Sequence, residues 1–115
     1  MSTRKKNSTN YLNEQELNAS CPMTFAMSKI SGRWKMIILY QISIGHNRYG
    51  ALQRAIPLIT EKMLTTQLRR LEVDNLIERH SYPEVPPRVE YTLTQEGSGL
   101  IPIMEQLTKW GAKNR

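Results

Sequence analysis

The chain has 115 residues, 39% of them hydrophobic, and a formal net charge of +6 with a pI near 9.7. One domain with a modest core suits this length, and the basic balance favours a polyanionic partner, most often nucleic acid. One cysteine and two histidines exclude a disulfide framework and a metal-ligand pattern, and no apolar run approaches a membrane span or a signal peptide, so we expect a cytoplasmic protein without metal or cofactor.

Residues 1–19 have the composition of an arm. A basic triplet, Arg4-Lys5-Lys6, lies among Ser, Thr and Asn, and little of the segment could be buried. We interpret the triplet as a solvated tail rather than a phosphate contact, although Tyr11, Leu12 and Leu17 are compatible with a short helix. The predicted domain then covers residues 20–115.

Two helices are predicted at the start of this domain. Pro22 suits a first helical position, and an apolar stripe continues to about Ile30 before Ser31-Gly32 interrupts it. Residues 33–42 are apolar enough for a well-buried helix, which Gly45 is placed to end.

A pair of helices joined by a tight turn follows. Residues 46–49 form an extended link that we expect to contribute one strand to a small sheet. Residues 49–55 then predict a short helix, which Pro57 stops. The longer helix begins at the N-cap Thr60 and continues to Glu72. Short helix, turn and longer helix give the helix-turn-helix arrangement.

The longer helix has two contrasting faces. Leu64, Leu68 and Leu71 share one face at helical spacing. The opposite face carries short polar and basic side chains, namely Lys62, Thr65, Thr66, Arg69 and Arg70. Alone, this pattern fits a solvated surface helix, but it also fits a helix that reads the DNA major groove.

After a left-handed turn at Asn75, residues 76–82 and 88–93 alternate as two strands. Three prolines in residues 83–87 prevent a continuous ladder and predict a hairpin with a stiffened tip. A last helix begins at Thr94 as N-cap, with Pro102 marking a kink or break. This helix is more apolar than a surface helix should be, so we expect it to form a dimer face.

The element order is that of a winged helix-turn-helix, mainly α with a small β-hairpin (α+β). The outer face of residues 60–70 is predicted to enter the major groove, and the hairpin to reach flanking DNA through Arg88 and Tyr82. Tyr49 and Arg54 are candidate phosphate contacts. For Arg88, an ion pair with Glu90 explains the residue equally well.

Several segments resemble the HxlR-type transcriptional regulators of the MarR-like group. They are Cys21-Pro22, Gly32-Arg33-Trp34-Lys35, Arg48 to Leu52, Ile59 to Glu72 and, most specifically, Tyr82-Pro83-Glu84-Val85-Pro86-Pro87-Arg88-Val89-Glu90-Tyr91-Thr92-Leu93-Thr94. The resemblance covers residues 21 to 111. It implies a homodimer that joins through its N- and C-terminal helices, binds an inverted-repeat operator in double-stranded DNA and represses, less often activates, nearby genes.

Cys21 has two interpretations. It is either a small buried hydrophobe or a reactive thiol whose pKa is lowered at a helix N-terminus. The resemblance implies sensing of oxidants or small electrophiles such as quinones through this thiol. Without a second cysteine, the options are a disulfide between two Cys21 residues of a dimer, a mixed disulfide, or alkylation.

Two other classes of function stay open at this stage. A winged-helix module for protein–protein interaction would show an acidic or apolar outer face on the second helix, where this chain is basic. An enzyme would need a catalytic constellation, and none is recognisable, so we expect no catalytic residues.

Overall fold

The computed structural model describes residues 21–115, so the predicted arm and its short helix lie outside the described residues. The described chain divides into two units, which meet between Ser31 and Gly32. In the first unit, helix α2 spans Pro22–Ile30 and has its proline in the first turn, as predicted.

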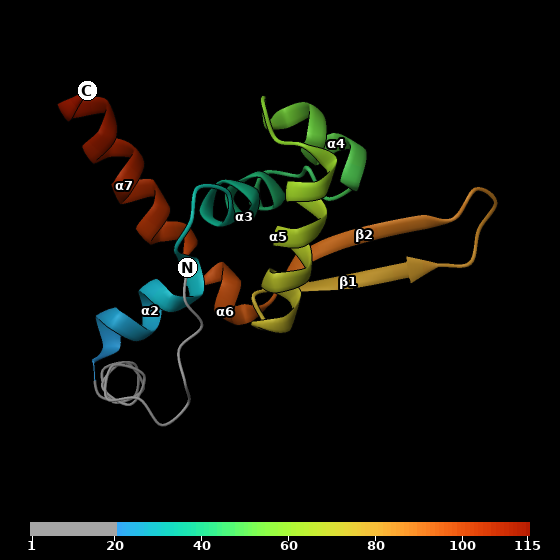
Figure 1. Ribbon diagram of the computed structural model, residues 1–115, viewed down its shortest axis with the longest axis horizontal. Coiled ribbons are helices and arrows are strands. Elements are labelled where there is room, and N and C mark those ends of the chain that lie inside the picture. The colour runs from blue at the N-terminus through green and yellow to red at the C-terminus, as the bar shows by residue number, and fades with distance from the viewer. Residues whose placement is uncertain (1–20) are drawn as a thin grey trace, which may run out of the picture. The chain divides into compact units, whose positions relative to one another are not determined.

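The second unit contains the helix-turn-helix and the hairpin (Figure 1). Its elements are α3 (Lys35–Ser43), α4 (Tyr49–Ala55), α5 (Glu61–Val73), β1 (Ile77–Tyr82), β2 (Arg88–Leu93), α6 (Gln95–Ser98) and α7 (Ile101–Asn114). The two strands extend beyond the helices of this unit (Figure 1). This arrangement confirms the mainly α, winged helix-turn-helix fold.

The C-terminal segment consists of two helices. Thr94 caps α6 by accepting the backbone N–H of Gly97 at 3.0 Å, and the segment breaks before α7 begins at Ile101. Pro102 lies in the first turn of α7. Proline is tolerated there because N–H groups in the first turn have no acceptor within the helix. Of the two predicted alternatives, the structure therefore has the break.

The prediction of a strand in the link before α4 was wrong. Residues 46–48 form no strand, and the sheet of the described chain has two strands. The link makes one backbone hydrogen bond with β2, in which the N–H of Tyr91 donates to the carbonyl of Asn47 at 2.8 Å. Gly45, with φ of 109°, turns the chain just before the link, and a single bond does not extend into a ladder.

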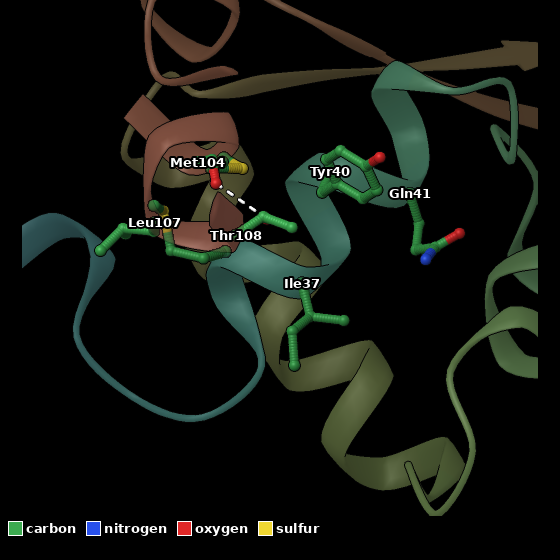
Figure 2. Close-up of a pocket in the computed structure, with 7 residues that line it drawn as sticks. Ile37, Tyr40, Gln41, Met104, Leu107 and Thr108 are labelled. Carbon is green, nitrogen blue, oxygen red and sulfur yellow. Dashed lines mark hydrogen bonds between the residues drawn. The ribbon is translucent and has the colours of Figure 1, made fainter. Parts of the chain in front are cut away.

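The core is centred on α3, α5 and the inner face of the hairpin. Its fully buried large side chains are Ile38, Leu39, Leu52, Leu64, Leu71 and Ile77. The predicted well-buried helix is α3, which buries Ile38, Leu39 and Ile42 but leaves Ile37 and Tyr40 exposed. They line an open pocket of about 320 Å³ between α3 and α7, which Figure 2 shows. Ile37 and Tyr40 therefore face this open pocket and are not part of the buried core.

A close backbone contact joins the end of β2 to the end of α5. Thr94 donates its hydroxyl to the carbonyl of Asn75 at 2.7 Å, and its N–H bonds the carbonyl of Leu76 at 3.1 Å. Gly97 is buried here, and a Cβ at this position would lie 2.1 Å from the Leu76 carbonyl oxygen. Only glycine fits, so this contact fixes where the hairpin leaves the helices.

Replacing Gly97 with alanine should lower the free energy of unfolding by about 1–3 kcal/mol or more, because the added methyl group collides with backbone. The matched control is Gly111→Ala in α7, where a Cβ would meet nothing within 4 Å. That variant should gain up to about 1 kcal/mol from helix propensity. Urea unfolding measures both, and equal changes in the two variants would contradict the close contact.

Candidate nucleic-acid interface

Helix α5 is held in one rotational setting by its leucine face. Leu64, Leu68 and Leu71 are buried in the core. The Thr60 hydroxyl accepts the backbone N–H of Met63 at 3.1 Å and caps the helix as predicted. With one face buried, the opposite face has to point to solvent.

The outward face of α5 carries five of the predicted contact residues. Lys62, Thr65, Arg69 and Arg70 are exposed on it, and Thr66 is half-buried at its margin. None of the described residues forms an ion pair with the three basic side chains. Their positive charge is therefore available to a partner.

Tyr49 connects α4 to α5 through two hydrogen bonds. Its hydroxyl donates to the carbonyl of Glu61 at 2.9 Å and lies 3.1 Å from Oγ1 of Thr65. A hydroxyl has one proton, so with the Tyr49 proton on the Glu61 carbonyl, Thr65 must be the donor in the second bond. In this arrangement Tyr49 positions α5, and neither hydroxyl has a spare proton.

A hollow of about 270 Å³ lies beside α5, and we call it the α5–β1 hollow. Its lining residues are Tyr49, Thr65, Leu68, Arg69, Glu72, Arg79 and Tyr91. Arg79 lines this hollow but is not among the contact residues predicted from the sequence. The alternation of the two strands could have placed Arg79 on the inner face of the hairpin, because Arg79 pairs with the inward-facing Tyr91.

The two predicted wing residues lie together. The guanidinium of Arg88 lies over the Tyr82 ring, 4.0 Å from its centroid, and pairs with Glu84 at 3.0 Å and Glu90 at 3.3 Å. Glu90 also pairs with Arg48, which precedes α4, at 3.6 Å. The charge of Arg88 is thus balanced in the free protein, and this network supports the hairpin tip.

Arg54 and Cys21 are the two remaining site residues predicted from the sequence. Arg54 is exposed on α4 and lines a separate hollow with Gln41 and His46. Cys21 belongs to the other unit, where it precedes α2 as its N-cap residue and is half-buried. The hydroxyl of Thr24 lowers the pKa of the Cys21 thiol, followed by the backbone N–H groups of Thr24 and Met23, and burial opposes them.

The described residues contain neither a metal-binding cluster nor a membrane-spanning helix. Between 21 and 115, no cluster of three or more His, Cys, Asp or Glu side chains is arranged to hold a metal ion. No helix in that range is long and apolar enough to cross a membrane.

Comparison with known proteins decides the family. The model of the HxlR-like helix-turn-helix family matches residues 29–115. The chain belongs to this family. YybR of Bacillus subtilis, an HTH-type transcriptional regulator, is 45% identical over 83% of the chain and 76% of its own length.

Two solved structures are similar to this HxlR-like chain. A protein described as a MarR-family regulator from Porphyromonas gingivalis W83 has a TM-score of 0.77 and 44% identity, covering 84% of this chain and 94% of its own. The redox regulator HypR in its oxidized form has a TM-score of 0.77 and 45% identity, covering 83% and 98%. The chain is accordingly a DNA-binding transcriptional regulator of the HTH type.

Replacing Tyr49 with phenylalanine should lower the free energy of unfolding by about 0.5–1.5 kcal/mol, because the Glu61 carbonyl and Thr65 lose their partner. Tyr40→Phe is the matched control, since the Tyr40 hydroxyl bonds none of the described residues. Its effect should stay within about 0.5 kcal/mol of zero. Urea unfolding measures the stability of both variants. Equal unfolding midpoints would show that the Tyr49 hydroxyl does not stabilise the fold.

Proposed function

We propose that the protein regulates transcription by inserting α5 into the major groove of an operator, with the hairpin on the flanking DNA. The observation that carries this proposal is the unpaired basic face of α5. Arginine and lysine donate to guanine edges and to phosphates, and threonine reaches either, which are the contacts a recognition helix needs. An acidic or apolar face would instead have favoured a protein partner.

The proposed functional form is a homodimer joined through its terminal helices. Ile103, Leu107 and Trp110 lie on one side of α7 at i, i+4 and i+7, and they are 51%, 56% and 67% exposed. Large apolar side chains repeated in this way support a protein interface. They continue toward the pocket between α3 and α7, where Leu107 lies beside Met104 and Thr108 (Figure 2).

A two-fold dimer would place two copies of α5 on the same side of the duplex. Their separation would be about 34 Å, which is one turn of B-DNA, and the operator would be an inverted repeat. A protein bound there would repress the neighbouring genes by occupying their control region. Nuclease protection of an inverted repeat beside the protein's own gene would test this proposal, and the absence of any protected repeat would count against it.

Replacing Arg69 with alanine should weaken binding to that DNA by about 1–3 kcal/mol, because a charged donor is lost from the interface. A gel-shift titration measures the change. Arg115→Ala serves as the matched control, because it removes the same charge from the exposed end of α7. Unchanged affinity in Arg69→Ala would remove Arg69 from the DNA contact.

We further propose that Cys21 is a thiol switch. Support comes from its lowered pKa, since the thiolate is the reactive form, and from the 45% identity to HypR, which is described as a redox regulator. Two Cys21 thiols from two subunits would join in a disulfide, passing two electrons and two protons to an oxidant such as diamide. A quinone would instead be added to the thiolate sulfur.

Treatment with diamide or a quinone should change DNA binding of the wild type and leave Cys21→Ser unchanged. The serine variant keeps a small polar side chain at the N-cap, so α2 should be preserved. The readout is a gel shift before and after treatment, with non-reducing electrophoresis to detect a disulfide-linked dimer. An identical response of both proteins would exclude Cys21 as the sensor.

A further inference from the structure

The α5–β1 hollow is lined by two guanidinium groups that take part in no ion pair with a described residue. They belong to Arg69 and Arg79. Arg88 on the same hairpin differs, because two carboxylates hold it. Two like charges beside one hollow repel each other, and an anion between them would remove that repulsion.

The register of the hairpin explains why Arg79 faces α5. Arg79 is paired with Tyr91, and residues directly opposite in an antiparallel pair lie on the same face of the sheet. Tyr91 is buried in the core, so that face is the inner one. Arg79 therefore extends along the inner side of β1 and is exposed where the core ends, beside α5.

Only the two guanidinium groups offer spare donors in the hollow. The hydroxyl protons of Tyr49 and Thr65 are engaged with the Glu61 carbonyl and with each other. Glu72 is the one carboxylate among the lining residues, which leaves a net charge of +1. An acceptor with several oxygens and a negative charge fits this lining best, and a phosphate is such a group.

We propose that the α5–β1 hollow binds one backbone phosphate of duplex DNA, held jointly by Arg69 and Arg79. The inference rests on the proposed insertion of α5 into the major groove, because a helix there has a phosphate backbone along each side. The hollow lies on the side of α5 that faces the hairpin. Arg79 is thus a DNA-contacting residue that fixes the register of α5 without reading sequence.

The test measures the salt dependence of DNA affinity for wild type, Arg79→Gln, Arg79→Lys and the control Arg115→Gln. Two duplexes of equal length are used, one from beside the protein's own gene and one unrelated. Losing one phosphate contact should lower the salt slope by about 0.9. Between about 50 and 200 mM salt, the wild type should then lose about 3.5-fold more affinity than Arg79→Gln.

The expected result is a reduced slope for Arg79→Gln on both duplexes, a largely restored slope for Arg79→Lys, and no change for Arg115→Gln. An unchanged slope in Arg79→Gln, or an effect confined to one duplex, would overturn the inference and leave the proposed function standing. Wild type that binds neither duplex would overturn the proposed function and this inference together. A thermal melt of each variant confirms that it is folded before binding is compared.

Discussion

The burial of three leucines of α5 is the constraint on which the rest of the structure depends. Leu64, Leu68 and Leu71 enter the core and leave α5 one rotational setting, so the polar and basic side chains must face outward. Successive residues of a helix are about 100° apart around its axis. If α5 turned by that angle, a leucine would face the direction in which Lys62 now points. The chemistry of the outer face is therefore fixed by packing on the inner face.

The hairpin depends on the same helix. Its origin is set where Gly97 and Thr94 meet the backbone just after α5, and its tip is held by Arg88 with Glu84 and Glu90. Glu90 also reaches Arg48 at the start of α4. Both parts that we expect to contact DNA are thus positioned against the helix-turn-helix before any DNA is bound, which lowers the ordering cost of binding.

Features with a local cause were predictable from the sequence. The spacing of leucines gave the inner face of α5, and hydroxyl caps gave the helix starts at Thr60 and Thr94. Features with a tertiary cause were not. The balance of Arg88 by two carboxylates depends on how the hairpin tip folds, and the exposure of Tyr40 depends on which elements pack against α3. Leu58 has a left-handed backbone with φ of 74°. This turn was not predictable, because glycine is the residue that usually signals such a conformation.

The most direct test of the central claim is a titration of ¹⁵N-labelled protein with duplex DNA from beside its own gene, followed by amide chemical shifts. Because the leucine face fixes which side of α5 is presented, the largest changes are expected at residues 60–70 and in the hairpin at residues 79–88. The amides of α3, which lies in the core beneath, should change least. Changes confined to α7, with α5 and the hairpin unaffected, would contradict the account.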